Sequence, residues 1–448
     1  MNKPKINGKR RKNMKKILVA GAGHGGLTAA ICLAKNGYDV TVVERSKPES
    51  MGYDWHDTMP ADTFEYAGID LPEEYEPSNR MAYVAPDGKT KVRMPDACRI
   101  DVDRKILIRH LIDNAEKAGV KLIFGQKIIA PVTAGAWITG FTAADDENTY
   151  IYSGDLVIDA CGMSSPVRSQ LPAHFGIENE FSKQNIFDVY RIYLENKTGE
   201  ITDPQYIVTF FNLDKPGIDW MNTNKDFIDI IVGKFEFSGD LTQEEIDATI
   251  AKYKKDFPYI GDKVLRGGTG VERIPISRML PLIVGNGYAA VGDSAGMTVP
   301  LTGSGIALSM KAGKILADTV IACEDKDLTI KALWPYQYKY YQDFGKDYVL
   351  LDLFKNLFTY IGTDDINYVM EKEILTADKM AIADGFPLKI ELSYLLHVAS
   401  VALPLAPMAP DLLKCFKLLP LLPVVNKSMP EEYDAQKVHS WVKLYKAL

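Results

Sequence analysis

Three glycines near the start of the chain have the types and spacing needed to hold a phosphate-linked ligand. Gly21, Gly23 and Gly26 follow a short apolar run at residues 17–20, and a stretch with helical spacing of apolar residues follows them. Such glycines permit a tight turn, a close approach of the main chain to a pyrophosphate and close packing of helix on strand. Glu44 ends the next apolar run, about 20 residues further on, where a carboxylate can bind ribose hydroxyls. The pattern predicts a dinucleotide site without choosing between NAD and FAD.

Two later segments repeat the combination of an apolar strand and a following Asp. Residues 155–168 read DLVIDACGMSSPVR, and residues 287–313 read GYAAVGDSAGMTVPLTGSGIALSMKAG. Asp159 and Asp293 therefore lie where a carboxylate can bind a hydroxyl of a ribityl chain. Gly305 and Ile306 open an amphipathic helix, whose first N–H groups attract a phosphate or an electron-rich ring edge. These segments favour a flavin nucleotide over NAD.

In this order and spacing, the motifs resemble the FAD-binding motifs of glutathione-reductase-type flavoproteins, a superfamily that includes the aromatic hydroxylases. The run GDSAGMTVPLTGSGI is similar to the geranylgeranyl reductase pattern, in which Gly-Asp-Ala-Ala-Gly is followed by Pro-Leu-Thr-Gly-x-Gly-Ile. The hydroxylases typically have His and Asn where this chain has Gly296 and Ile306. Asp103 and Arg104 open a predicted helix at which the family has an arginine that contacts the flavin. The resemblance runs from about residue 16 to about residue 316 and implies FAD as the cofactor.

The resemblance and the motifs together imply a set of residues that contact FAD. These are Gly21, Gly23, Gly25, Gly26, Glu44, Arg45, Trp55, His56, Arg104, Ile128, Asp293, Gly305 and Ile306. His24 lies in the glycine loop and is expected to face solvent or the edge of the ligand. Because only one nucleotide fingerprint is present, we expect no separate NAD(P)H domain. Electrons would then come from transiently bound NAD(P)H or from a protein donor such as a ferredoxin.

The clearest departure from the family lies in the loop after the second predicted strand. The archaeal reductases have Cys-Gly-Asp there, beside the flavin, and the cysteine is tied to the reduction of isolated double bonds. Alignment on Phe64 and Gly68 places Trp55, His56 and Asp57 at those positions. Only the aspartate of the family's triplet is kept, so the loop of this chain carries different chemistry.

The candidate catalytic residues are His56, Asp57 and Tyr53, because histidine gives and accepts protons near neutral pH and its neighbours can relay them. The competing interpretation is a surface loop with a half-buried tryptophan. A second departure concerns the substrate cavity, where the family has Tyr-x-Trp-x-Phe-Pro and this chain keeps only Trp220. Trp220 and Trp55 are predicted to contact substrate, and packing within a sheet is the alternative for Trp220.

The predicted fold class is α/β (α+β overall), with a Rossmann-like FAD-binding domain that is discontinuous because its motifs lie far apart. Its pieces are expected at residues 15–75, 98–168 and 268–325. The inserted stretches 76–97 and 169–267 are predicted to form an antiparallel sheet over the flavin, the substrate-binding domain. Runs at 207–211, 227–232 and 234–237 fit strands better than helices. Residues 1–14 are expected to be a basic flexible extension and residues 326–448 a helical cap.

The apolar segment LSYLLHVASVALPLAPMAP, residues 392–410, is long enough to span a bilayer. Pro404, Pro407 and Pro410 interrupt it, so we expect no transmembrane helix. The segment either caps the substrate cavity or lies in a membrane interface. Both interpretations suit a hydrophobic substrate.

Composition and charge restrict the partners. The formal charge of the whole chain is −7. Eight Lys and Arg residues lie in the first 16 positions, so the remainder of the chain carries −15. An acidic body argues against sequence-independent nucleic-acid binding. The basic head, which no secretory apolar segment follows, is either a solvated extension or a tether to anionic lipid at the inner face of a membrane. Five dispersed cysteines and six histidines indicate free thiols in the cytoplasm and no metal site.

These observations predict an FAD-dependent oxidoreductase that reduces a carbon–carbon double bond of a hydrophobic, isoprenoid- or lipid-like substrate by hydride transfer from reduced flavin. One alternative is an FAD-dependent monooxygenase of a hydrophobic or aromatic substrate. Another is a non-redox, flavin-bound lipid-binding protein in which Trp55 and His56 close the reactive face. A flavin-dependent isomerase or cyclase is a further alternative. Anaerobic turnover separates the reductase from the monooxygenase, because only the monooxygenase requires oxygen.

Overall fold

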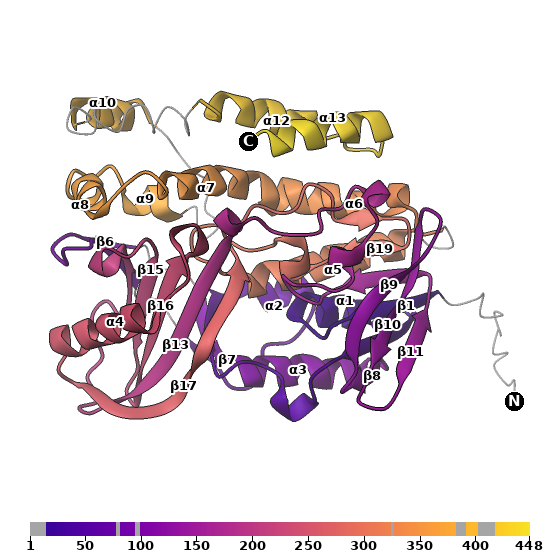
Figure 1. The fold of residues 1–448 in the computed structure, drawn as a ribbon, viewed down its shortest axis with the longest axis horizontal. Helices are drawn as coiled ribbons and strands as arrows, with labels where there is room; N and C mark the ends of the chain where they lie inside the picture. Colours follow the sequence, from indigo (N-terminus) through magenta and orange to yellow (C-terminus); the bar gives the residue numbers. More distant parts are fainter. Residues whose placement is uncertain (1–14, 78–80, 95–98, 324–326, 382–390, 402–416) are drawn as a thin grey trace, which may run out of the picture.

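The computed structural model describes residues 15–77, 81–94, 99–323, 327–381, 391–401 and 417–448. Two β-sheets lie side by side, and the C-terminal helices form a layer along one side of both (Figure 1). The predicted basic extension at 1–14 and the second half of the apolar segment at 392–410 lie outside the described residues. The mixed α/β architecture that the sequence predicts is confirmed.

The nucleotide-binding sheet has the strand order β18-β19-β12-β1-β2-β8. All neighbours pair in parallel except β18 with β19. Its strands are β1 (Lys16–Ala20), β2 (Asp39–Glu44), β8 (Lys121–Phe124), β12 (Leu156–Asp159), β18 (Val284–Gly285) and β19 (Tyr288–Ala290). The chain runs from β1 outward to β2 and β8 and later returns to β12 on the other side of β1, so the carboxyl end of β1 is a switch point at which such sheets bind ligands. The apolar runs predicted as strands are confirmed here.

Helices cover this sheet and carry the motif residues. The helix α1 (His24–Lys35) packs against α5 (Ile306–Ala322) and α3 (Arg104–Lys117). A shorter helix, α2 (Asp62–Ala67), packs on α5. Two small sheets border the domain. One contains β9 (Lys127–Ala134), β10 (Trp137–Ala144) and β11 (Thr149–Ser153); the other contains β3 (His56–Pro60), β7 (Arg99–Asp103) and β4 (Glu76–Pro77).

The second large sheet has seven strands in the order β17-β13-β16-β15-β14-β5-β6. Its strands are β5 (Met81–Val84), β6 (Lys91–Arg93), β13 (Ile186–Asn196), β14 (Tyr206–Phe210), β15 (Ile218–Thr223), β16 (Phe227–Phe235) and β17 (Ile260–Pro275). All neighbours pair antiparallel except β5 with β14. The apolar side chains of α4 (Gln243–Asp256) cover the face of this sheet that points away from the nucleotide domain.

Two sequence predictions about this sheet are wrong in detail. Residues 234–237 are not a separate strand, because β16 runs unbroken to Phe235 and a 3-10 turn follows at Glu236–Ser238. The boundary placed at residue 268 falls inside β17, which stays paired with β13 as far as Pro275. The ladder between β13 and β17 continues past the glycines of β17, with register shifts.

The C-terminal region is helical, as predicted, in the residues that the structure describes. Its helices are α6 (Ile330–Tyr340), α7 (Lys346–Leu357), α8 (Thr363–Glu371), α9 (Ala377–Met380), α10 (Leu392–Val401), α12 (Leu422–Ser428) and α13 (Ala435–Lys446). A π-helical turn at Tyr341–Gly345 joins α6 to α7. Trp334 and Tyr341 are buried against Trp441 of α13, so helix packing accounts for these aromatic residues. No helix of the described part is long and apolar enough to cross a membrane.

Candidate functional site

A cavity of about 400 Å³ lies between the nucleotide-binding domain and the seven-stranded sheet. The nucleotide domain contributes β3, Arg104 and the start of α5; the sheet contributes one face of β13 to β16; the turn before α7 contributes Phe344. The helical cap predicted from the sequence therefore supplies part of the wall. Most of the residues predicted to act on flavin or substrate meet at this cavity or at the glycine loop beside it.

The glycine loop leaves room for a phosphate at the start of α1. Gly21 has a φ of +87°, and a Cβ there would lie 2.7 Å from the Ala160 carbonyl oxygen. Gly23 precedes the helix without a side-chain cap, so the first N–H groups of α1 are left for a ligand. Gly25 and Gly26 serve packing instead, because a Cβ on either would lie 2.6 Å from α5 or from Ala160. This loop fits the pyrophosphate of FAD.

Glu44 is held at the end of β2 by two main-chain donors. The N–H of Ala22 donates to one carboxylate oxygen at 2.9 Å and the N–H of Ser46 to the other at 2.8 Å. Each oxygen keeps a lone pair for a ribose hydroxyl, as the prediction requires. Arg45 is exposed, and Ile128 is buried in the core of β9, so only the main chain of Ile128 can face a ligand.

The two aspartates that follow apolar strands have different surroundings. Asp159 is fully buried and accepts hydrogen bonds from Ser165 at 2.5 Å, Tyr288 at 3.0 Å and Ser294 at 3.2 Å. These bonds give Asp159 a structural role, and its buried carboxylate is not available to bind a ribityl hydroxyl. Asp293 lies beside Gly305, and burial raises the pKa of its carboxyl to about 6. Of the two, Asp293 alone keeps a place in the predicted flavin site.

Arg104 and Asp57 form a bidentate ion pair on the cavity wall. The Nε of Arg104 donates to Asp57 Oδ2 at 2.6 Å, and a second guanidinium nitrogen donates to Oδ1. Burial alone would raise the pKa of Asp57, but Arg104 holds that pKa below its ordinary value. Asp57 is therefore ionised at neutral pH and cannot itself supply a proton. The Arg104 guanidinium also stacks on Trp55, with 4.7 Å to the ring centroid.

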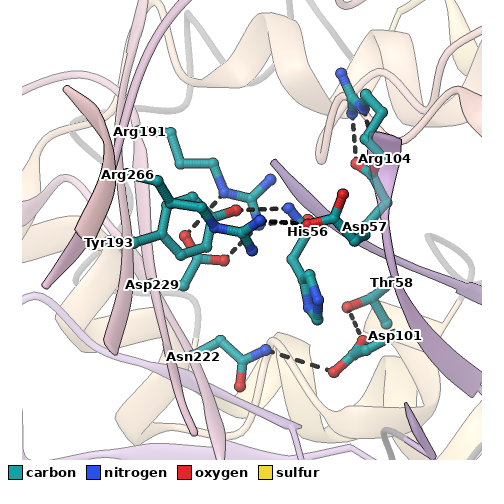
Figure 2. Close-up of polar contacts among 11 residues, drawn as sticks. His56, Asp57, Thr58, Asp101, Arg104, Arg191, Tyr193, Asn222, Asp229 and Arg266 are labelled. Carbon is teal, nitrogen blue, oxygen red and sulfur yellow. Dashed lines mark hydrogen bonds and ion pairs between the residues drawn. The ribbon is translucent and has the colours of Figure 1, made fainter. Parts of the chain in front are cut away.

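The main chain of His56 is fixed on both sides by the seven-stranded sheet (Figure 2). Its N–H donates to the Tyr193 hydroxyl at 2.5 Å, and its carbonyl accepts from Arg191. Asp229 in turn binds the Arg191 guanidinium through Nε at 2.8 Å and through a second nitrogen. Neither imidazole nitrogen of His56 has a hydrogen-bond partner in the part of the chain that the structure describes, and His56 lines the cavity. The ring packs edge-on against Phe227, with 5.6 Å between ring centroids, and its nitrogens are left for a ligand.

The remaining predicted residues are distributed as follows. Trp55 and Trp220 both line the cavity, from the loop before β3 and from β15. Tyr53 is 47% exposed and stacks against Trp55 at 5.2 Å, outside the lining. His24 begins α1 with a buried Nε2 that has no hydrogen-bond partner among the residues the structure describes, and burial beside Arg104 lowers its pKa to about 4. His24 is therefore neutral at pH 7 and adds no charge to the nucleotide loop.

Sequence reasoning missed the polar residues of the sheet. Arg191, Tyr193 and Asp229 stand in strands that are otherwise apolar, and Tyr206 lines the cavity from β14. Charged residues at inward positions of β13 and β16 were the available signal, because such residues are seldom buried unless they are paired. What the sequence could not supply was the partner, since His56 and Arg191 are 135 positions apart.

Comparisons with known proteins agree with this geometry. A family model described as "FAD binding domain" matches residues 14–325. The digeranylgeranylglycerophospholipid reductase of Sulfolobus acidocaldarius is 25% identical over 81% of this chain and 82% of its own length. A geranylgeranyl bacteriochlorophyll reductase-like structure from Thermoplasma acidophilum superposes with a TM-score of 0.72 at 16% identity, over 90% of this chain and 99% of that one. A flavin-dependent brominase reaches 0.61 at 14% identity, over 87% of this chain and 98% of its own. The last two likenesses show a shared fold.

Proposed function

Because the chain belongs to the FAD binding domain family, we propose that it reduces a carbon–carbon double bond of an isoprenoid- or lipid-like substrate. The chain is an FAD-binding oxidoreductase; the reaction and the substrate class are the proposal. The cavity supports it most, because an apolar sheet face lies opposite the residues expected to hold the flavin. The digeranylgeranylglycerophospholipid reductase similar to this chain acts, by its name, on such a lipid.

The residues that would hold FAD are those of the glycine loop, Glu44, Arg104, Asp293 and the start of α5. When bound and reduced, FAD supplies hydride chemistry. The protein positions the flavin and the substrate and determines the electrostatic field around them. The Arg104–Asp57 pair is charge-balanced and rigid, and it keeps a guanidinium at the cavity wall with little freedom to move.

We assign the proton of the reduction to His56. Saturating a double bond requires a proton at one carbon in addition to a hydride at the other, so a donor must face the cavity. His56 has both nitrogens unengaged and a main chain fixed by Tyr193 and Arg191. Asp57 is ionised and Tyr53 lies outside the lining, so both fit supporting roles better than direct proton donation.

The apolar wall would hold the hydrocarbon chain and exclude water. Val208, Ile218 and Ile231 project from neighbouring strands of the sheet face, and Trp220 lies among them. Removing such surface from water contributes about 25 cal/mol per Å². The electron donor, NAD(P)H or a protein, and any peripheral membrane contact stay part of the proposal, since no described residue distinguishes between them.

Anaerobic single turnover tests the function. The FAD-loaded protein is reduced with dithionite, mixed with a polyprenyl compound, and followed at the flavin absorbance band while the product is analysed by mass spectrometry. Reoxidation with a gain of two hydrogens per double bond is the expected result. A protein that reoxidises only when oxygen is added, with oxygen incorporated into product, would instead be the monooxygenase. Reduced flavin that no alkene reoxidises would support the non-redox alternative.

A further inference from the structure

Two residues of the cavity wall, Arg191 and Tyr206, have hydrogen-bond donors that the proposed reduction does not use. Arg191 and Tyr206 line the cavity from β13 and β14, at the end near β3. The opposite part of the lining is apolar and includes Val189, Val208, Ile218, Ile231, Ile274 and Val299. The sheet side of the cavity is therefore amphiphilic, with the donors of Arg191 and Tyr206 at one end and apolar side chains beyond them.

Arg191 has a donor left over after its structural contacts. Its side chain is only 6% exposed, and Nε and one terminal nitrogen bind Asp229 and the His56 carbonyl. The other terminal nitrogen, Nη1, has no hydrogen-bond partner within the described ranges. A guanidinium nitrogen at a cavity wall that has no protein partner can donate to an oxygen of a ligand.

Tyr206 presents a second free donor on the same sheet face. Its hydroxyl has no hydrogen-bond partner in the portion of the protein that the structure covers, and its side chain faces the cavity. Burial raises the pKa of Tyr206, while the nearby Arg191 opposes that rise. The hydroxyl is thus protonated and can donate. Tyr206 pairs in register with Asn222, and Asn222 pairs with Asp229, so Tyr206 and Asp229 share one row of the sheet face with β15 between them. Arg191 and Asp229 are both near enough to affect the pKa of the Tyr206 hydroxyl.

The charges around these donors cancel. Arg191 is paired with Asp229, Arg104 with Asp57 and Arg266 with Asp103. Figure 2 shows the first two of these pairs. The exposed side of the cavity has one lysine, Lys311, and three aspartates, Asp62, Asp343 and Asp347. Arg99 also lines the cavity, and Asp101, two residues further along β7, is buried. The lining as a whole has four cations, Arg99, Arg104, Arg191 and Lys311, and four carboxylates, Asp57, Asp62, Asp343 and Asp347, so it offers no excess of positive charge. Transfer of an anion into such a site would leave its charge uncompensated, at a high desolvation cost.

We propose that Arg191 and Tyr206 form a subsite for an uncharged, oxygen-bearing group of the substrate, a hydroxyl or a carbonyl, while the apolar lining takes the hydrocarbon chain. This inference rests on the proposed function and narrows its substrate class. It excludes a headgroup with a free phosphate from this end of the cavity. It also fixes the direction in which the substrate's hydrocarbon chain lies along the sheet, because the oxygen-bearing end of the substrate binds only at this subsite.

Three C20 polyprenyl probes of the same chain test the proposal: the primary alcohol, its diphosphate ester and the hydrocarbon that lacks the oxygen. Binding to the oxidised, FAD-loaded protein is measured by quenching of tryptophan fluorescence, because Trp55 and Trp220 line the cavity. The alcohol should bind at least tenfold more tightly than either of the others. Tyr206→Phe should weaken binding of the alcohol about three- to tenfold, the range for one hydrogen bond. It should leave binding of the hydrocarbon unchanged.

The control is Tyr190→Phe, which removes a hydroxyl from β13 on the opposite face of the sheet, where Tyr190 belongs to the cluster under α4. It should bind all probes like the parent protein. Arg191 is left intact because it also holds His56. Tighter binding of the diphosphate, an equal loss of alcohol and hydrocarbon affinity in Tyr206→Phe, a loss of FAD from that variant, or no binding of any probe would each overturn the subsite. Alcohol binding as expected without reoxidation of reduced flavin would leave the subsite standing and remove the reductase function.

Discussion

The Arg191–Asp229 pair gives the sharpest test of how the sheet supports the site. Asp229 is fully buried, and the Arg191 side chain is 6% exposed. Burial alone would lower the pKa of the Arg191 guanidinium, but Asp229 raises that pKa above its ordinary value, so both partners stay ionised. Asp229→Ala leaves a buried cation without its partner. Such a change costs about 3–5 kcal/mol of unfolding free energy, against at most about 1 kcal/mol for an exposed pair.

The matched control is the double variant Arg191→Met/Asp229→Leu, which removes both charges and keeps most of the volume. Replacing a buried pair by apolar residues is often neutral or stabilising, so this variant should recover most of the lost stability. Urea unfolding of the FAD-saturated proteins, followed by circular dichroism, measures both. Product formation should stay low in the stable double variant, because the His56 carbonyl has lost its donor.

Two results would refute this account of the pair. A cost below about 1 kcal/mol for Asp229→Ala would mean that water reaches the guanidinium as it does at a surface. A double variant as unstable as the single one would mean that packing and hydrogen bonds, and not the unpaired charge, determine the loss.

Three further predictions follow from the same contacts. His56→Gln should lower product formation about 10²- to 10⁴-fold in single turnover, the usual contribution of a proton donor, while the FAD content per protein, read from the visible spectrum, stays unchanged. Gly25→Ala should cost about 1–3 kcal/mol in thermal or urea unfolding through overpacking against Ser309, whereas Gly285→Ala, where the nearest atom to a Cβ is 3.8 Å away, should cost far less; equal costs would contradict the packing role. Because the Asp293 pKa is raised to about 6 in the folded protein and is about 3.9 in an unfolded chain, the contribution of Asp293 to the stability of the FAD-free protein should fall as pH rises from 4 to 6, so Asp293→Asn should gain stability relative to the parent protein over that interval in urea titrations.

The nucleotide-binding half was predictable because its signals are local. The strands β1, β2, β12 and β19 are buried on both faces, so each reads as a continuous apolar run followed by a turn. The positions of Gly21, Gly23 and Glu44 follow from the geometry of a single strand–helix–strand unit. No contact between distant parts of the chain is needed to infer them.

Asp159 and Asp293 mark the limit of such local signals. Both follow a buried strand and precede small residues, so the sequence assigns them the same task. The structure separates them through Tyr288, which is 129 positions from Asp159 and donates to its carboxylate. The pairing of β12 with β19 brings this donor close to Asp159. Neither motif predicts the order of the strands in the sheet.

The departure of the β3 loop from the family pattern has a physical explanation only in the assembled fold. Trp55 replaces a smaller residue, and its ring lies 4.7 Å from the Arg104 guanidinium and 5.5 Å from that of Arg191. An indole attracts cations at its face, so it can lie between two like charges that would otherwise repel. Each guanidinium is also paired with its own aspartate, Asp57 or Asp229. The loop and the sheet are therefore linked by one set of contacts. Trp55 interacts with both arginines, and each arginine is neutralised by its own aspartate. A change at any of these residues should alter the position of His56, even where the altered residue does not contact it.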